Sequence, residues 1–356
     1  MPSADRDRHE HLRVSTLERE LSSVKVSVLP DFFFDRILPL PSLRKLFKQA
    51  EAKAAVGGGN LRGYVQTEIR GGNASNLAVA LAALSVNTCL YCIGDHRVLG
   101  MLTERSKNCE VRLIPGQPGF TVALEFPFRR RIVNVMISDV GDLARFDGES
   151  FSSQDITCLR KSDSVALVNW SANVSGNELA RRVFTLRGRK RRLNFLDPAD
   201  LAGAEKRIGR LARMIADEGL IDVLSLNENE ARIITKRLGL RRLPFHYRAH
   251  DVLVASSELH DELKVTVDIH TPLGSASASD GEHGWEPSVA YVHGFVTGAG
   301  DVWDAGDIVG HLMNFSIRER LRFANANAYL YLASRKARFA GLKEVMYFMR
   351  GRNRPR

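Results

Sequence analysis

The fold of this chain is best approached from Val296-Thr297-Gly298-Ala299-Gly300-Asp301-Val302-Trp303-Asp304-Ala305-Gly306, a segment with three glycines. The apolar run at 289–295 in front of it predicts a buried strand. Behind it, apolar residues recur at the spacing of one helix face, at Val302, Ala305, Ile308, Val309 and Leu312. Between the two lie Gly298, Ala299 and Gly300, whose lack of bulk allows a tight turn from strand to helix.

This turn has the composition of an anion-binding site. A helix start exposes backbone N–H groups, and together with the helix dipole they attract an anion, typically phosphate. Asp301 lies beside them and could accept a proton from an attacking hydroxyl. The alternative is that the glycines only make the turn and Asp301 only caps the helix. The dinucleotide fingerprint G-x-G-x-x-G is not matched, because Trp303 occupies the last glycine's place, and the chain contains no P-loop motif.

The composition is that of a soluble globular protein with a full core. The 356 residues, 44% hydrophobic and 26% charged, suffice for one large domain or two smaller ones. No apolar run is long enough to span a membrane, and the N-terminus lacks an apolar signal core. Cys89 and Cys92 form one C-x-x-C, but Cys109 and Cys158 form no second one. We therefore expect neither a disulfide framework nor a cysteine metal site, and a reducing, cytoplasmic location.

The net charge is +10, and basic proteins include nucleic-acid binders. The basic residues gather at 129–131, 187–192, 318–322 and 350–356, without the interleaved aromatic side chains of a recognition module. This pattern favours a solvated basic surface over nucleic-acid binding. Such a surface would also attract anionic substrates.

Two early segments place polar side chains beside predicted elements. Residues 1–23 form a charged extension with a short amphipathic pattern, and the alternation at 24–28 predicts a strand. Asp31 and Asp35 follow that strand, where carboxylates can bind hydroxyl groups. The alternative is a loop with two solvated aspartates.

A second glycine-rich segment, Gly71-Gly72-Asn73-Ala74-Ser75-Asn76, precedes a helical pattern. The glycines permit close approach of a ligand, Asn73 or Ser75 can cap the helix, and Asn76 lies in its first turn. Residues 119–138 predict a hairpin with its turn at 127–131. Taken alone, each segment is also explained as plain structure.

From residue 150 on, predicted strands and helices alternate. The strands end in polar residues: 164–168 at Asn169, 191–196 at Asp197 and 221–226 at Asn227. In a parallel sheet such ends meet at one edge, where ligands of open α/β folds bind. Asn227 and Glu230 share a helix face, although an N-cap with a capping-box glutamate is the simpler explanation of this pair alone.

Three of these segments together resemble motifs of the PfkB (ribokinase-like) carbohydrate kinase family. Gly298–Asp301 followed by Ala305-Gly306 resembles its C-terminal signature, Gly71-Gly72 with Asn76 its N-terminal motif, and Asn227 with Glu230 its N-x-x-E motif. They occur in the family's order, and the resemblance covers roughly residues 24–340. It implies a three-layer αβα sandwich with a mostly parallel central sheet. The kinase domain would span 24–349, with a small β-sheet lid from about 36–70 and 119–138, an extension at 1–23 and a basic tail at 350–356.

The resemblance also implies a reaction, phosphoryl transfer from ATP with Mg²⁺ to a hydroxyl of a sugar, a related polyol or a nucleoside. Asp301 would be the base, and the N–H groups of Gly298, Ala299 and Gly300 would stabilise the transferred phosphate. The acceptor would contact Asp35, Gly71, Gly72, Asn73, Asn76 and Asn169. The nucleotide side would use Asn227, Glu230 (on Mg²⁺ through water) and Asn325 (beside the adenine). A homodimer formed through the lid is a further expectation.

Some positions depart from the family pattern. Phe295, Val296 and Thr297 stand where the family often has Asp-Thr-Thr, so potassium activation is not implied. The strand predicted at 252–255 runs into Ser256 without the usual Thr–Gly pair that touches the nucleotide. Asp304 lies one turn after Asp301 and could approach the metal, but we expect it on an exposed acidic helix start. Two other classes therefore stay open, a nucleic-acid-binding protein and a metabolite sensor without turnover.

Overall fold

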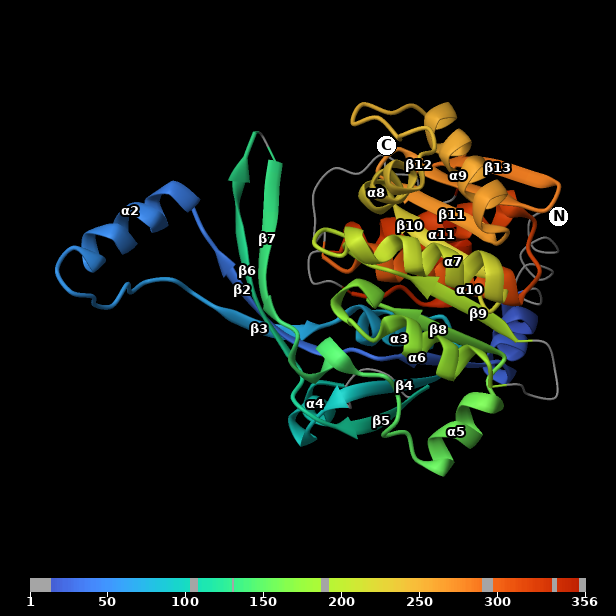
Figure 1. Ribbon diagram of the computed structural model, residues 1–356, viewed down its shortest axis with the longest axis horizontal. Helices are drawn as coiled ribbons and strands as arrows, with labels where there is room; N and C mark the ends of the chain where they lie inside the picture. The colour runs from blue at the N-terminus through green and yellow to red at the C-terminus, as the bar shows by residue number, and fades with distance from the viewer. Residues whose placement is uncertain are drawn as a thin grey trace, which may run out of the picture.

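A computed structural model describes residues 14–102, 108–129, 131–186, 192–289, 297–334 and 338–351. Helices cover both faces of a nine-stranded sheet, and a separate four-stranded sheet projects from this body (Figure 1). The predicted α/β sandwich with a mostly parallel sheet and a small β lid is therefore confirmed. The expectations for residues 1–13, 187–191, 290–296 and 352–356 lie outside the described residues.

The central sheet has the strand order β13-β12-β11-β10-β9-β8-β1-β4-β5. Its strands are β1 (Lys25–Leu29), β4 (Asn87–Gly94), β5 (Cys109–Pro115), β8 (Ser164–Val168), β9 (Leu193–Asp197), β10 (Val223–Asn227), β11 (Thr266–Thr271), β12 (Gly274–Ser279) and β13 (Glu282–Pro287). Neighbouring strands from β5 to β11 pair in parallel, and β11, β12 and β13 pair antiparallel. The carboxyl ends of the parallel strands thus share one edge, as predicted.

Two groups of helices pack on the two faces of this sheet. One face carries α5 (Ser153–Arg160), α6 (Gly176–Phe184), α7 (Ile208–Glu218), α8 (Glu228–Leu238) and α9 (Ala249–Leu263). The other carries α3 (Asn73–Ala83), α4 (His96–Leu102), α10 (Ala299–Leu312), α11 (Ile317–Leu332) and α12 (Leu342–Met349). Short 3₁₀ helices occupy Gly141–Arg145, Trp170–Ala172 and Glu205–Arg207. Successive strand residues face opposite layers, so Val28 and Leu29 enter different cores.

The four-stranded sheet has the order β3-β2-β6-β7 and contains both segments predicted as the lid. Its strands are β2 (Phe33–Pro39), β3 (Thr67–Gly71), β6 (Gly119–Phe128) and β7 (Arg131–Asp139). Figure 1 shows α2 (Leu43–Ala54) at the end of this sheet that lies away from the body. The predicted hairpin is present, although β6 continues through Phe128 into the expected turn.

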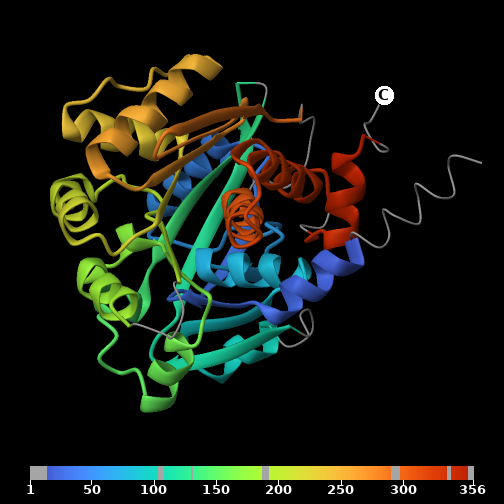
Figure 2. The same cartoon turned by 90° about the vertical axis from the view of Figure 1, so that its right-hand side faces the viewer.

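Part of the predicted N-terminal extension packs on the body. Residues 14–23 are helical, and Leu21 is fully buried in the same core as α12. Glu18 forms an ion pair with Lys343 on α12 at 3.3 Å, and Figure 2 shows the two helices side by side. Among the described helices, none combines the length and apolar character needed to cross a membrane.

Candidate active site

Helix α10 begins with the predicted anion-binding turn. Its N-cap, Gly298, has φ 83° and ψ 3°, a left-handed conformation that favours glycine. A Cβ at Gly298 would also lie 3.1 Å from the side-chain nitrogen of Asn76. The first helical hydrogen bond runs from the Val302 N–H to the Gly298 carbonyl at 3.1 Å. The N–H groups of Ala299–Asp301 therefore have no acceptor within the helix and can bind an anion.

Asp301 is buried at this helix start and held by two amides from α3. Asn73 Nδ2 donates to Asp301 Oδ1 at 2.9 Å, and Asn76 Nδ2 donates to Oδ2 at 3.0 Å. Burial raises the pKa of Asp301 well above its ordinary value, and the negative charge of Asp197 adds to this, whereas the two amides lower it. A carboxylate with a raised pKa is a stronger base than an ordinary aspartate.

The start of α3 is capped by a residue from another segment. Asp31 accepts hydrogen bonds from the backbone N–H groups of Asn73 at 2.9 Å and Ala74 at 2.8 Å. The expectation that Asn73 or Ser75 caps the helix is therefore wrong; Ser75 Oγ donates to the Gly71 carbonyl at 2.6 Å instead. Because Asp31 caps α3, the Asn73 side chain is directed to Asp301. The alternative of a loop with two solvated aspartates is wrong too, since Asp31 and Asp35 are both buried.

Asn169, at the end of β8, lies behind this cap. Its side-chain amide donates to Asp31 Oδ2 at 3.1 Å, and its backbone has φ 55° and ψ 40°. The side chain is buried, with 9% of the residue exposed. Asn169 therefore orients Asp31 and, through it, the start of α3.

Asp35 lies on β2 where the lid meets the body. Its carboxylate occupies the place of a side chain at Gly71, since a Cβ there would lie 2.0 Å from Asp35 Oδ2. Burial raises the pKa of Asp35 to about 6, with a lowering by the Thr121 hydroxyl and a further rise from Asp31. Gly72, with φ 95°, brings the start of α3 close to the backbone of Phe32 and Phe33, since a Cβ at Gly72 would lie 3.0 Å from both. The structure thus brings the residues predicted for the acceptor together on β2, β3 and α3, with Asn169 behind them at the end of β8.

Asn134 on β7 is a candidate site residue that sequence reasoning missed. Its Nδ2 donates to Thr297 Oγ1 at 2.8 Å, which links the lid to the residue before Gly298. Its Oδ1 is buried and has no hydrogen-bond partner among the described residues. The only sequence signal was an amide between Val133 and Val135 in the second strand of the predicted hairpin.

Asn227 and Glu230 form a complete capping box at the start of α8. Asn227 Oδ1 accepts from the Glu230 N–H at 3.0 Å, and Glu230 Oε2 accepts from the Asn227 N–H at 2.7 Å. Glu230 Oε1 accepts from Asn227 Nδ2 at 2.5 Å. Burial raises the pKa of Glu230 well above its ordinary value, and the charge of Asp197 adds to the rise. The capping-box explanation is thus confirmed, and the pair lies close enough to Asp197, at the end of β9, to be affected by its charge.

The strand predicted at 252–255 is wrong. Residues 252–255 belong to α9, and the strand that follows α8 is β11, which ends at Thr271. Thr271 Oγ1 donates to the Gly274 carbonyl at 2.8 Å. The apolar run was mistaken for a strand because it is short; the buried positions of α9 in fact continue at helical spacing to Leu263.

Asn325 on α11 joins three elements near a pocket. Its Oδ1 accepts from Trp303 Nε1 at 2.8 Å and from Ser275 Oγ at 3.0 Å, and its Nδ2 donates to the Glu286 carbonyl at 3.1 Å. It lines a pocket of about 590 Å³ between β13, α11 and α12. The pocket wall also contains Pro287, Ser288, Val289, Arg318, Arg322, Ala326 and Phe348.

Asp304 and Asp307 are completely buried, so the expectation of an exposed acidic helix start is wrong for Asp304. The reason is that the sheet, α3 and α11 surround α10, so its polar residues are packed against these elements and not exposed to solvent. Asp304 Oδ1 accepts from Ser225 Oγ on β10 at 2.5 Å. Burial raises the pKa of Asp304 well above its ordinary value, with a further rise from Asp197.

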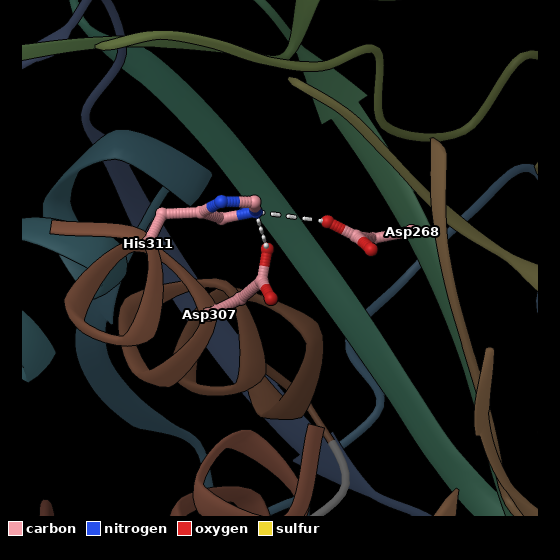
Figure 3. Close-up of side chains that lie close together, drawn as sticks. All are labelled: Asp268, Asp307 and His311. Atoms are coloured by element: carbon pink, nitrogen blue, oxygen red, sulfur yellow. Dashed lines mark hydrogen bonds and ion pairs between the residues drawn. The ribbon is translucent and has the colours of Figure 1, made fainter. Parts of the chain in front are cut away.

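Asp307 belongs to a separate buried ion network, part of which is drawn in Figure 3. Arg320 Nη1 lies 2.7 Å from Asp268 Oδ2 and also contacts Asp307. His311 Nε2 lies 3.2 Å from Asp268 Oδ2 and 3.5 Å from Asp307 Oδ2. The two carboxylates and the histidine have metal-ligand character, but Arg320 already supplies a cation to both aspartates. We therefore interpret the network as a structural connection of β11, α10 and α11.

No family model and no curated protein matches the sequence. Solved structures nevertheless resemble the fold over almost its whole length. Arabidopsis thaliana ribokinase, in a structure with ribose and ATP, has a TM-score of 0.65 and 19% identity over 92% of this chain and 98% of that one. Adenosine kinase from Sinorhizobium meliloti gives 0.67 and 14%, and phosphofructokinase-2 from Escherichia coli 0.66 and 14%, both over 92% and 98% of the two chains. The chain therefore has the ribokinase-like fold.

Proposed function

We propose that the protein is an ATP-dependent kinase that phosphorylates a hydroxyl group of a sugar or related polyol. The observation that carries this proposal is the placement of Asp301. A buried carboxylate, held by Asn73 and Asn76, lies at a helix start whose N–H groups have no helical acceptor. A base beside an anion site is what phosphoryl transfer to a hydroxyl requires. The shared fold of ribokinase, adenosine kinase and phosphofructokinase-2 supports the same class of reaction.

In the proposed reaction, Asp301 takes the proton of the acceptor hydroxyl as its oxygen attacks the γ-phosphorus of ATP. The bond from that phosphorus to the β–γ bridging oxygen breaks, and ADP leaves. The N–H groups of Gly298, Ala299 and Gly300 stabilise the charge on the transferred group. The buried carboxylate of Glu230 would hold Mg²⁺ through water, and the ion would neutralise phosphate charge.

The acceptor would lie between the lid and α3. Asp35 can accept hydrogen bonds from two hydroxyls, and the amides of Asn73 and Asn76 can both donate and accept, which suits a neutral polyol. Contact between the lid and the helix start, made by Asn134 and Thr297, would help to exclude water from the reaction.

The remaining assignments concern the nucleotide and assembly. Asn325 would lie beside the adenine, which the pocket of about 590 Å³ at α11 is large enough to hold. The lid exposes apolar side chains, including Val122, Val135 and Ile137. A second copy covering them would give the homodimer through the lid.

A nucleoside kinase is the second candidate, supported by the likeness to adenosine kinase. A panel of sugars, polyols and nucleosides assayed for ADP release separates the two candidates. Titration with a short oligonucleotide tests the nucleic-acid alternative. If the oligonucleotide binds and no sugar or nucleoside does, the kinase proposal fails.

A further inference from the structure

Asp304 is a carboxylate buried in the body without a counter-charge. Asp304 lies one turn after Asp301 on α10 and is 0% exposed. Ser225 donates to Oδ1, but Oδ2 is buried and, among the residues that the structure describes, has no hydrogen-bond partner. Burying a carboxylate in this way is costly unless a proton or a cation accompanies it.

The surroundings of Asp304 are acidic. Ser225 on β10 follows Leu224, which is in register with Leu196 on β9, so Asp197 lies beside Ser225 on the same face of the sheet. Asp197 acts electrostatically on Asp304, Asp301 and Glu230. Within the described part of the chain, no lysine, arginine or histidine forms an ion pair with these four carboxylates.

The next turn of the same helix shows a different arrangement. Asp307 is as deeply buried as Asp304, but Arg320 and His311 supply positive charge to it. The chain therefore provides an internal cation for one buried aspartate and none for the aspartate one turn earlier. The turn of α10 that lacks the cation is the one that follows Asp301.

We propose that Asp304, with Asp197 as a second carboxylate, binds a divalent cation directly at the sheet edge beside Asp301. Hard divalent cations such as Mg²⁺ and Mn²⁺ take carboxylate oxygens as ligands. Glu230 is less suited to direct binding because both of its oxygens already accept hydrogen bonds in the capping box. That the ion serves phosphoryl transfer rests on the proposed function, whereas the ion site itself does not.

The test uses Mn²⁺ as the probe, added to the full chain without nucleotide or acceptor, with free Mn²⁺ followed by electron paramagnetic resonance. The wild type is expected to bind Mn²⁺, and Asp304→Asn should raise the Kd by about tenfold or more. Asp280→Asn removes the same charge from an exposed turn and should leave the Kd unchanged. Asp304→Asn should also lose the rise in Tm that Mn²⁺ gives the wild type.

Absence of Mn²⁺ binding by the wild type, or unchanged binding by Asp304→Asn, would overturn the proposal in favour of a proton shared by Asp197 and Asp304. If Asp304→Asn does not fold, Asp197→Asn decides by the same comparison. Mn²⁺ binding that depends on Asp304 in a protein that phosphorylates no acceptor would reject the proposed function alone. Turnover together with Mn²⁺ binding that is independent of Asp304 would reject this inference alone.

Discussion

Asn76 donates a hydrogen bond of 3.0 Å to Asp301, and this contact joins the first turns of α3 and α10. The two residues are 225 positions apart in the sequence, so the contact exists only in the folded chain. It fixes the orientation of the Asp301 carboxylate, and it lowers a pKa that burial and Asp197 raise. The contact therefore positions the Asp301 carboxylate, the proposed base, relative to α3, the helix proposed to contact the acceptor.

Asp301→Asn is expected to keep the fold and to lower kcat by about 10²-fold or more, because an amide cannot act as the base. The variant retains the shape of the side chain and its position against Asn73 and Asn76. Steady-state ADP release, with circular dichroism as the control for folding, measures the effect. Turnover close to that of the wild type would show that Asp301 is not the base.

Asn76→Ala should move the acidic limb of the kcat–pH profile to higher pH. As the proposed base, Asp301 would act in its deprotonated form, so activity should be lost as pH falls through its pKa. The Asn76 amide lowers the pKa of Asp301, whereas burial and Asp197 raise it. Without this amide, the pKa of Asp301 should therefore rise further. The comparison is made between the two pH profiles at saturating acceptor. A profile that keeps its acidic limb, with only KM changed, would assign Asn76 to acceptor binding alone.

Local sequence patterns predicted those parts of the candidate site that lie within single segments. The turn at Gly298–Asp301 and the start of α3 follow from glycines next to apolar periodicity, and their element types were predicted correctly. The cap of α3 was missed because Asp31 reaches it from 42 residues earlier in the chain. The burial of Asp304 was missed because it depends on which elements surround α10, and that is tertiary information.

Asp35→Ala should raise the KM for the acceptor by about ten- to a hundredfold, with much less effect on ATP binding. The loss would leave acceptor hydroxyls unpaired in a closed site, at a cost of roughly 1–3 kcal/mol. Calorimetric titrations with ATP and with the acceptor, each measured separately, test the difference. Binding of an oligonucleotide should if anything tighten in this variant, because the protein is basic. Equal losses for ATP and acceptor would indicate a general structural defect instead.

Glu230→Gln should raise the Mg²⁺ concentration needed for turnover and leave acceptor binding without nucleotide unchanged. Glutamine keeps an acceptor for the Asn227 N–H in the capping box but removes the charge that faces Asp197. The Mg²⁺ dependence of ADP release is the measurement. An unchanged Mg²⁺ requirement would leave Glu230 with its capping role only.

His311 should make the free energy of unfolding depend on pH. Burial and Arg320 lower its pKa, but Asp307 and Asp268 outweigh them, so the net pKa is raised. Protonated His311 therefore adds stability that is fully present below its unfolded pKa of about 6.5 and is lost as pH rises through the folded pKa. Arg320 stays charged throughout. Burial alone would raise the pKa of Asp268, but Arg320 and His311 hold this pKa below its usual range.

His311→Gln keeps a hydrogen-bond donor that does not titrate. The loss of stability in this variant should be about 1–3 kcal/mol larger at about pH 5.5 than at about pH 9, as for a charge-assisted hydrogen bond. Urea unfolding of the wild type and of His311→Gln at each pH gives the difference between their free energies of unfolding. Other groups titrate in both proteins, so their contributions cancel in this difference. His283→Gln, a change at an exposed histidine of β13, serves as the control and should show no such dependence. If His311→Gln costs the same at both pH values, His311 does not carry a proton in the folded protein.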